Sequence, residues 1–578
     1  MNVLGLSFHY HDAAAALVRD GRVVAAAAEE RFSRKKHDSG FPRLATAYCL
    51  EEARLLARDL DLVVFYEKPW RKFERILLQH IAAWPRSFPQ YRQAIPAWLN
   101  RKLWVPYLVT EEIGYRGKVS FVPHHLAHAA AAFFCSPYDE AAILTIDGVG
   151  EHTTTAMGAG RGGLVKLTHE VRFPHSLGLL YSAVTAHLGF EVNEGEGKVM
   201  GLAPYGTARM KKDFAEVLHV GTDGSFVLDM SYFAFLEKLW MGSAKLEKLF
   251  GPARKPGEPL TEHHKDLAAS LQATLEDAAL ALAQAAFRAT GSKKLCLAGG
   301  VALNCVANGR IAKEGPFEEL FVQPASGDDG GALGAALYAS YVDLGLPRQD
   351  PPGTASLGPE YGADEIALIC RAYGVPSRRL TADEIVRETA DLIAGEKIVG
   401  WFQGRMEFGP RALGNRSILA TPKRADMKDV LNARVKHREE FRPYAPAIPI
   451  ESAPDYFDLR QQSPYMLLAV AVHPERRAEI PAVTHVDGTA RVQTVNEAEH
   501  PLYYRLLKEL GRITGTPVVL DTSFNVKGEP VVCAPEHALD CFLGTEIDAL
   551  VLGDHLILKE QCRPAIASPV AAAEAVRP

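Results

Sequence analysis

Two stretches of the chain repeat the same order of elements, and this repeat constrains the fold more than any other feature. In residues 2–28, the apolar NVLGLS precedes the polar HYHD, AAAALV follows, and Asp20-Gly21 leads into VVAAAA. In residues 141–169, AAILTI precedes the turn DGVG, and HTTTAMGA, a glycine turn and GLVKLTH follow. Apolar runs joined by Asp-Gly turns predict β-hairpins. Both stretches are therefore expected to form strand, turn, strand, turn, strand.

An internal repeat of this kind indicates a duplicated architecture. A strand, an acid–glycine turn and a second strand open each of the two lobes in actin-like ATPases and sugar kinases. In those folds the turns hold phosphate or metal between the lobes. Two unrelated β-meanders would give the same pattern, and the repeat alone leaves both interpretations open.

Strand-like and helical segments alternate after the second repeat unit. KKLCLAGG precedes the helical VALNCVANGRIA, and FEELFVQP precedes the loop ASGDDGG and the helical ALGAALYASYV. This alternation predicts an α/β architecture with ligands at the carboxyl ends of the strands.

The dense Pro and Gly content of residues 344–362 predicts a linker. A second, smaller α/β region is expected to begin near Ala363, with ADEIVRETADLIAGE as its opening helix and KIVGWFQG as a strand. The tail from Ile566 is predicted to be disordered.

The length of 578 residues is too great for a single hydrophobic core. The net charge of −6, from 64 basic and 70 acidic residues, gives no reason to expect a nucleic-acid or membrane partner. No apolar run reaches membrane-spanning length, and the N-terminus lacks the positive region of a signal peptide, so a cytoplasmic location is expected. The eight cysteines are scattered without a C-x-x-C pair, which argues against a disulfide framework.

Three histidines within VPHHLAHAAAAFF suggest a metal site. On a helix, His124 and His128 are separated by four residues and project from one face. His125 and His128, separated by three, fit as well, and a buried histidine pair without metal is a further alternative. Asp147 ends a strand at a glycine turn and Asp328 precedes a helix, although Asp329 is equally placed. Two imidazoles and two carboxylates suit a divalent metal such as Fe or Zn.

Three other segments suggest anion binding. Gly299-Gly300, with Asn304 in the next helix, is typical of a backbone phosphate site, although tight strand-to-helix packing also explains it. In EERFSRKKH, Lys36 could hold an anionic leaving group, or the run could be a solvated face.

The sharpest of these signals lies in the second region, where glycines alternate with arginines and hydroxyl-rich DTSFN follows. Guanidinium groups bind phosphate oxygens bidentately, and glycines let the backbone approach a ligand, so a nucleotide or phosphoanhydride pocket is expected. Surface cations on an acidic protein would explain each residue singly. The cations in question are Arg405, Arg411, Arg416, Lys436, Arg438, Arg442 and Arg491.

Taken together and in order, these motifs resemble the O-carbamoyltransferases of antibiotic biosynthesis and nodulation-factor modification. The motifs are HDAAAALVRDG, EERFSRKKH, HHLAHAAAAF, GKVMGLAPYG, GGVALN, GPRALGNRSI, FRPYAP and TSFN, and they span nearly the whole chain.

The resemblance implies two active sites. It implies an actin-like first domain of residues 1–350, with about 530–565 returning to it. This domain would be similar to the enzyme that installs threonylcarbamoyl on tRNA. It also implies a smaller α/β domain of residues 360–528 with a twisted sheet. This second domain would be similar to threonylcarbamoyl-adenylate synthase, and would make carbamoyl adenylate from ATP, with Mg²⁺, and carbamoyl phosphate.

The resemblance also assigns roles to single residues. His124, His128, Asp147 and Asp328 would bind a divalent metal, most commonly Fe²⁺, which favours them over His125 and Asp329. His11 would act as base or orienting group for a hydroxylated small-molecule acceptor, and Lys36 would assist. The residues that match nucleotide and carbamoyl phosphate contacts are Arg411, Lys436, Arg442, Arg491 and Ser523.

Relatives commonly read NTSFN, whereas this chain has Asp521 in that position. Asp521 places an acid beside a predicted phosphate site, so its contact is an open point. Residues 65–115 and 225–260 are candidates for the loops that shape the acceptor pocket. The stretch WRKFERILLQHIAAWPRSFPQYRQAIPAWL within the first of them is instead favoured as a packed helical insertion. The oligomeric state is not predicted.

Three other functions are alternatives for a chain with these motifs. A threonylcarbamoyl transferase acting on tRNA would need a basic surface, which the net charge disfavours. A non-catalytic actin-like ATP-binding protein would leave Asp147 and Asp328 unexplained, and also the arginine-rich segment of the second region. A sugar kinase would not need the histidine pair.

Overall fold

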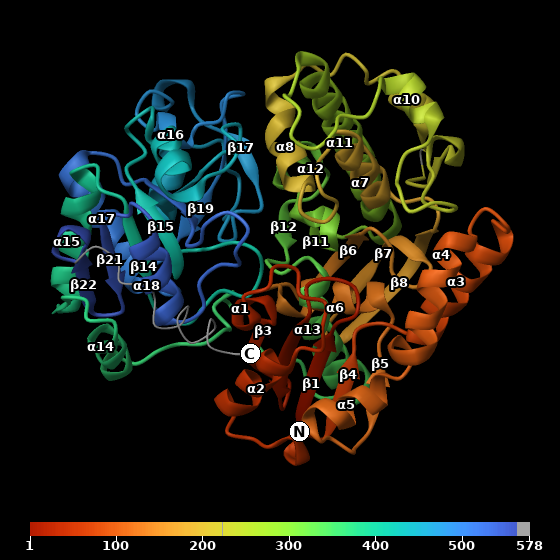
Figure 1. Cartoon of the computed structure of the whole chain (residues 1–578), viewed down its shortest axis with the longest axis horizontal. Coiled ribbons are helices and arrows are strands. Elements are labelled where there is room, and N and C mark those ends of the chain that lie inside the picture. The colour runs from red at the N-terminus through yellow and green to blue at the C-terminus, as the bar shows by residue number, and fades with distance from the viewer. Residues whose placement is uncertain (222, 563–578) are drawn as a thin grey trace. The chain divides into compact units, whose positions relative to one another are not determined.

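The computed structural model describes residues 1–221 and 223–562. The chain forms two compact units (Figure 1). The first contains residues 1–29 and 37–353, and the second contains residues 30–36 together with the chain from Thr354. The division after Gly353 falls inside the segment 344–362 that composition predicts as a linker. The tail from Ile566, predicted to be disordered, lies outside the described residues.

The first sheet of the first unit has five strands in the order β3-β2-β1-β4-β5. Its first three strands are antiparallel neighbours, and β4 and β5 continue in parallel from β1. The strands are β1 (Asn2–Ser7), β2 (Ala14–Arg19), β3 (Arg22–Ala28), β4 (Leu62–Phe65) and β5 (Val119–Phe121).

The second sheet has the same topology in the order β8-β7-β6-β11-β12. Its antiparallel meander is again extended by two parallel strands from the first strand of the meander. The internal repeat in the sequence is thus confirmed as two equivalent half-structures, the two-lobed actin-like architecture. The strands are β6 (Glu140–Ile146), β7 (Thr153–Arg161), β8 (Leu164–Arg172), β11 (Lys294–Ala298) and β12 (Glu319–Val322).

Two helices lie between these half-structures. α6 (His124–Cys135) follows the first sheet but packs on the second, against β6 and β11, whereas α13 (Asp328–Tyr338) follows the second sheet and packs on β1 and β2 of the first. The two helices also contact each other closely. A Cβ atom at Gly334 would lie 1.8 Å from the carbonyl oxygen of Ala127, so the crossing requires glycine.

The remaining elements of the first unit surround this core. The long helix α11 (Glu262–Thr290) packs on α12 (Cys305–Glu314) and on β6 and β7. The others are α2 (Arg43–Glu52), α3 (Pro69–Ala82), α4 (Phe88–Ala97), α5 (Val105–Ile113), α7 (Leu177–His187), α8 (Glu196–Leu202), α9 (Phe214–Val217), β9 (Leu218–Val220), β10 (Phe226–Leu228) and α10 (Ala244–Phe250).

The second unit is built on an eight-stranded mixed sheet with hydrophobic cores on both faces. Along its central strand β14, Trp401 lies in one core and Phe402 in the other, as strand alternation requires. The strand order is β13-β22-β21-β14-β15-β20-β16-β19.

Helices α15 and α17 pack together in this unit, and α14 and α18 pack together as well. The strands are β13 (Arg378–Arg379), β14 (Val399–Phe402), β15 (Arg416–Ala420), β16 (Ala445–Pro449), β17 (Ala469–Ala471), β18 (Thr489–Arg491), β19 (Gln493–Val495), β20 (Val519–Ser523), β21 (Ala549–Leu552) and β22 (His555–Leu558). The helices are α1 (Glu30–Ser33), α14 (Ala363–Ala372), α15 (Ala382–Ala394), α16 (Met427–Leu431), α17 (Pro501–Thr514) and α18 (Pro535–Gly544).

Two expectations for this unit are corrected by the structure. The segment of about 530–565, expected to return to the first domain, belongs to the second unit, because β21 pairs in parallel with β14 and β22 pairs with β21. The opening helix is α14, which precedes the expected ADEIVRETADLIAGE helix (α15).

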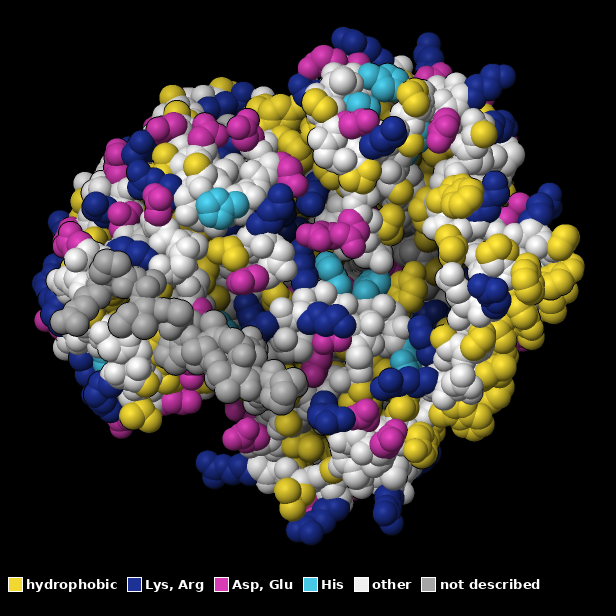
Figure 2. Space-filling model, in the orientation of Figure 1, with side chains coloured by type: hydrophobic (Ala, Val, Ile, Leu, Met, Phe, Trp, Pro, Cys, Tyr) yellow, Lys and Arg dark blue, Asp and Glu magenta, His cyan; other side chains and the backbone are white. Residues whose placement is uncertain are grey.

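Among the described residues, no helix has both the length and the apolar character needed to cross a membrane. Cationic and anionic side chains are interspersed over the visible faces of both units, as the near-balanced composition predicts (Figure 2). The cytoplasmic location stays a prediction.

Candidate functional sites

Four predicted metal ligands come together in the first unit. His124 and His128 lie on successive turns of α6, Asp147 follows β6, and Asp328 is the first residue of α13. The ends of two half-structures thus meet at one point, since α6 packs on the second sheet and α13 on the first.

The ligand atoms of these four residues converge. The Nε2 atom of His124 lies 3.2 Å from Asp147 Oδ2, 3.6 Å from Asp328 Oδ1 and 3.0 Å from His128 Nε2. His128 Nε2 lies 3.7 Å from Asp328 Oδ1. One ligand atom from each residue lies within 4.8 Å of the others, and all four residues are buried.

The electrostatics of the group favour a proton or a metal ion among its members. Burial lowers the pKa of His124, but Asp328 and Asp147 outweigh it and raise the pKa to about 9. Burial likewise opposes ionisation of Asp147, yet the hydrogen bond and charge of His124 hold its pKa well below the usual value. Two carboxylates facing two imidazole nitrogens at these distances need a proton or a metal ion between them. The nitrogen and oxygen donors fit a borderline divalent metal.

The two alternative ligands lie outside this group. Both ring nitrogens of His125 have protein partners, with Nδ1 2.7 Å from Thr145 Oγ1 and Nε2 2.9 Å from the carbonyl oxygen of Thr153. Burial lowers the pKa of His125 to about 3. Asp329 is buried but is not one of the four converging residues. Geometry therefore favours the four converging residues over His125 and Asp329, and their role as metal ligands stays a prediction.

His11 lies beside the four candidate metal ligands, which we call the metal-type group. Its Nε2 atom is 4.0 Å from Asp328 Oδ2, and its Nδ1 atom is 2.8 Å from Asp12 Oδ2. Burial lowers the pKa of His11, but Asp328 and Asp12 outweigh it and raise the pKa to about 9. Asp12, with φ of 54°, is held in the left-handed region, a strain typical of functional turns.

Sequence reasoning did not single out Asp12 or Tyr66. The Tyr66 hydroxyl donates to Asp328 Oδ2 at 3.2 Å and therefore orients a candidate ligand. Asp12 was visible as the neighbour of His11 in the HD motif. Tyr66 carried no signal, because its position after β4 becomes meaningful only when α13 packs against that sheet.

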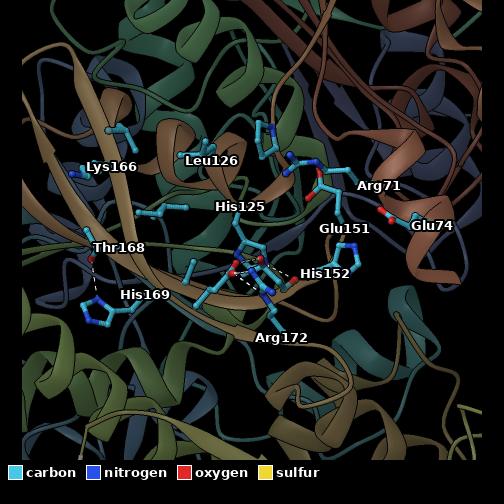
Figure 3. Close-up of a pocket in the computed structure, with 16 residues that line it drawn as sticks. Arg71, Glu74, His125, Leu126, Glu151, His152, Lys166, Thr168, His169 and Arg172 are labelled. Carbon is cyan, nitrogen blue, oxygen red and sulfur yellow. Dashed lines mark hydrogen bonds and ion pairs between the residues drawn. The ribbon is translucent and has the colours of Figure 1, made fainter. Parts of the chain in front are cut away.

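A polar cavity of about 760 Å³ lies next to the metal-type group (Figure 3). Glu151 joins the two, since its carboxylate accepts from the backbone N–H of His124 at 3.1 Å and of Lys68 at 2.8 Å. The lining of the cavity includes Arg71, Glu74, His125, Glu151, His152, Lys166, Thr168, His169, Glu170 and Arg172. Acids and bases are balanced in this lining, which suits an uncharged polar ligand.

The predicted phosphate site at Gly299, Gly300 and Asn304 has another structural role. The Gly300 N–H donates to Asp147 Oδ1 at 2.9 Å, so this turn supports a candidate metal ligand. Asn304 caps α12 by accepting from Ala307 N–H and makes two amide hydrogen bonds, of 2.9 and 3.0 Å, with Gln272. Its phosphate contact stays a prediction.

In the second unit, Lys436 and Ser523 lie together. The Lys436 ammonium donates to the carbonyl and hydroxyl oxygens of Ser523, and to the Asn525 carbonyl and side-chain oxygens at 3.0 and 2.8 Å. Burial and the neighbouring Arg438 hold the pKa of Lys436 well below its usual value. The structure thus brings together two of the five residues predicted to contact nucleotide or carbamoyl phosphate.

Two arginines of the Gly-Arg motif have structural roles instead. Arg416 is fully buried and donates to the carbonyl oxygens of Gln403, Gly404, Asn415 and Pro359 at 2.7 to 3.0 Å. Arg405 donates to the carbonyl oxygens of residues 357 and 358.

The loop between these arginines is fixed by Glu407, which sequence reasoning missed. Its Oε1 atom accepts from the backbone N–H groups of Leu413, Asn415 and Arg416 at 2.7 to 3.2 Å.

Asp521 lies on the buried strand β20, where Tyr503 donates a hydrogen bond to its Oδ2 atom at 2.7 Å. Burial raises the pKa of Asp521 to about 8. At neutral pH it is a neutral carboxylic acid, close in size and polarity to the asparagine that the resemblance implies.

The remaining predicted residues belong to the second unit. Arg491 ends β18, and Arg411 and Arg442 lie in loops, all three partly buried. Lys36 lies in the segment of residues 30–36, which is part of this unit. Their roles stay predictions.

Models of two protein families match the chain. The model for the carbamoyltransferase N-terminus matches residues 2–337, and the model for the carbamoyltransferase C-terminus matches residues 390–559.

Several curated proteins are similar to this chain. The nodulation protein NolNO of Sinorhizobium fredii is 40% identical, with 96% of this chain and 80% of that protein covered. An uncharacterized protein of Synechocystis is 44% identical, with 96% and 97% covered. The 3'-hydroxymethylcephem-O-carbamoyltransferase of Amycolatopsis lactamdurans is 40% identical over 41% of this chain and 43% of its own length.

Among solved structures, a ROK hexokinase from Thermus thermophilus aligns at a TM-score of 0.28 and 18% identity. That alignment covers 60% of this chain and 100% of the hexokinase.

Proposed function

The chain belongs to the carbamoyltransferase family, and we propose that it is an ATP-dependent O-carbamoyltransferase that uses carbamoyl phosphate. In this proposal, the second unit hydrolyses carbamoyl phosphate to carbamate and phosphate. A carbamate oxygen then attacks the α-phosphate of ATP, with Mg²⁺, so that pyrophosphate leaves and carbamoyl adenylate forms. The first unit then transfers the carbamoyl group to a hydroxyl of a small molecule. The observation that carries the proposal is the buried convergence of two imidazoles and two carboxylates, with His11 beside it, in the part of the chain that matches the family's N-terminus.

His124, His128, Asp147 and Asp328 would hold a divalent ion, and the resemblance favours Fe²⁺. Such an ion would polarise the carbamoyl carbonyl or the adenylate phosphate and stabilise the charge that develops there. His11 would face the acceptor hydroxyl with Nε2, because its Nδ1 atom is engaged by Asp12. It would take the hydroxyl proton in its neutral form, which a divalent cation bound at Asp328 would favour over the protonated form.

In the second unit, Lys436 and Ser523 would contact phosphate oxygens together with Arg411, Arg442 and Arg491. Adenylation would favour the transfer step, because AMP as a leaving group offers the enzyme more groups to bind than phosphate does. A neutral Asp521 removes the expected repulsion between an acid and these phosphates.

The polar cavity beside Glu151 is our candidate for the acceptor pocket. Its wall includes the neighbours of two candidate metal ligands, since His125 follows His124 and Glu151 follows Asp147 by four residues. The balanced charge and hydroxyl-bonding groups of the lining favour an uncharged, hydroxyl-rich acceptor.

The first test supplies ATP and carbonyl-labelled carbamoyl phosphate without acceptor, and measures pyrophosphate and labelled carbamoyl adenylate. The proposal predicts that both form. A panel of hydroxylated acceptors then tests transfer. Absence of both products from folded, metal-loaded protein, with and without these acceptors, contradicts the proposal.

A variant separates the two half-reactions. His124→Ala is expected to lose bound metal and carbamoyl transfer while pyrophosphate formation continues. His219→Ala, at an exposed histidine of β9, serves as the matched control. Transfer that survives His124→Ala at the wild-type rate would remove the metal assignment.

A further inference from the structure

Helix α3 of the first unit buries several polar side chains and exposes several apolar ones, which is the reverse of an ordinary surface helix. Its buried side chains include the polar Lys72, Arg75 and His80, whereas Trp70, Leu78 and Ile81 are 55 to 61% exposed. A surface helix of a globular protein normally buries its apolar face and exposes its charged face.

Two of the buried polar side chains of α3 have contacts within the first unit. Lys72 donates to Glu67 Oε2 at 2.5 Å, and the guanidinium of Arg75 lies 4.6 Å from the centre of the Phe173 ring. The inward orientation of the polar side is therefore a specific packing arrangement. It leaves the apolar side of the helix facing outward.

The exposed apolar surface continues beyond α3. Figure 2 shows hydrophobic side chains gathered along one edge of the first unit, over α3 and α4. We call this surface the aromatic face and define it by Trp70, Leu78, Ile81, Trp84, Phe88, Leu239 and Trp240, which are 48 to 64% exposed.

Several contacts hold the parts of the aromatic face together. Trp84 and Phe88 pack edge to face with ring centres 5.4 Å apart. The loop that carries Leu239 and Trp240 is fixed to α3 by Gln79, which donates to the carbonyl oxygen of residue 236, and to α4 by Gln90. The face is thus a built surface.

The charge around the aromatic face differs from that of the whole chain. Residues 68–113 contain eight Lys and Arg against three Glu, in a chain whose net charge is −6, although Lys72 and Arg75 are buried and Arg86 pairs with Glu237 at 3.0 Å. Exposed cations on or beside the face include Arg71, Arg86, Arg92 and Lys238. The Lys238 ammonium lies 5.0 Å from the Trp240 ring centre.

We propose that the aromatic face docks the protein onto the surface of an anionic lipid bilayer. Tryptophan, aliphatic side chains and arginine are the residues that settle at the boundary of headgroups and acyl chains. Three tryptophans of the six in the chain are exposed on this face. Lys and Arg near such a surface are attracted to anionic headgroups. The net charge of the whole chain does not reveal this attraction, because the exposed cations lie together at one face.

A second copy of the chain is a less favourable occupant. A symmetric contact through this face would bring the exposed cations Arg71, Arg92 and Lys238 of two copies near one another, and like charges opposed across an interface are costly. An anionic surface instead neutralises this charge while it covers the apolar side chains.

The test is co-sedimentation of the full chain with vesicles of phosphatidylcholine alone or of equal parts phosphatidylcholine and phosphatidylglycerol. Binding is expected to the anionic vesicles and to weaken with added salt, because screening reduces the headgroup attraction. Leu78→Gln combined with Ile81→Gln and Trp240→Gln is expected to lower the partition coefficient about tenfold or more. The control combines Leu164→Gln and Leu368→Gln, which alter leucines that are 66 and 61% exposed elsewhere.

A charge variant tests the electrostatic part. Arg92→Glu is expected to weaken binding to anionic vesicles about fivefold or more, whereas Arg387→Glu, at an exposed arginine of α15, is expected to have little effect. Light scattering on the same proteins reports self-association.

Two outcomes overturn the proposal. One is the absence of binding to anionic vesicles at low salt. The other is a dimer that the triple variant abolishes, with vesicle binding unchanged by that variant, which assigns the face to a second copy. Because carbamoyl adenylate formation is not measured in this test, its result is independent of the proposed function.

Discussion

The two units use charged side chains in opposite ways. In the first, two histidines and two aspartates turn their ligand atoms toward one another within 4.8 Å. In the second, Arg416 and Arg405 direct their guanidinium groups at backbone carbonyl oxygens and build the loop that carries them. The difference teaches that a motif dense in arginine can be a scaffold, whereas converging opposite charges in a buried place indicate a site for a ligand.

The largest expected effect concerns the first unit. Under the proposed function, removal of metal by a chelator is expected to lower carbamoyl transfer by about a thousandfold or more, since the ion would supply several kcal/mol of charge stabilisation. Pyrophosphate formation should continue once the chelator is removed and Mg²⁺ is restored, because the proposed function assigns that step to the second unit. Re-addition of Fe²⁺ should restore transfer. Equal loss of both half-reactions would contradict this division of labour.

The next effect tests the scaffold role of Arg416. Arg416→Ala is expected to destabilise the second unit by about 3 kcal/mol or more, because several buried carbonyl oxygens lose their donor. Arg411→Ala is the matched variant, and it should cost about 1 kcal/mol or less while abolishing pyrophosphate formation. Denaturant unfolding and the pyrophosphate assay measure the two effects. Unchanged stability of Arg416→Ala would break the comparison.

Asp521 allows a smaller test by pH. In the unfolded chain its carboxyl ionises near the ordinary value of 3.8, whereas in the folded protein it keeps its proton to about pH 8. The folded state therefore binds the extra proton between these values, and this carboxyl lowers stability progressively from about pH 4 to about pH 8.

Asp521→Asn removes this penalty. The unfolding free energy of the variant, relative to that of the wild type, is expected to rise by about 2 kcal/mol or more from pH 5 to pH 8, since one pKa unit corresponds to about 1.4 kcal/mol. Unfolding midpoints at both pH values measure the gain. A stability difference that does not grow with pH would show that the carboxyl is ionised in the folded protein.

The smallest expected effect concerns Asn304. Asn304→Ala should destabilise the first unit by about 1 kcal/mol, because α12 loses its cap. It should leave the Michaelis constants for ATP and carbamoyl phosphate unchanged. A rise in either constant without loss of stability would restore the phosphate role that the sequence suggests.

Patterns with a fixed period were predictable from the sequence. The repeated hairpins gave the two equivalent sheets, because side-chain alternation and Asp-Gly turns act locally. The His124–His128 spacing needed only a helix. The choice between His125 and His124 was not predictable from spacing, since it depends on how α6 packs on the second sheet and places the His125 ring against Thr145.

Features that depend on distant packing were missed. The orientation of α3 cannot be read from its sequence, because PWRKFERILLQHIA is amphipathic whichever side faces inward. The expected return of residues 530–565 to the first domain was wrong, since β21 completes the second sheet through a parallel pair with β14. Both outcomes depend on partners far away in the chain.

The placement of the four ligands has a mechanical consequence. Three of them are attached to the second sheet, through α6 and β6, and Asp328 is attached through α13 to the first. An ion held by all four would act as a clasp between the halves of the first unit, resisting any motion that parts them. The melting temperature of this unit should then climb with the concentration of free metal ion, by the ordinary linkage between binding and folding. A single bound ion would in this way make the rigidity of the first unit depend on the concentration of metal ion around it.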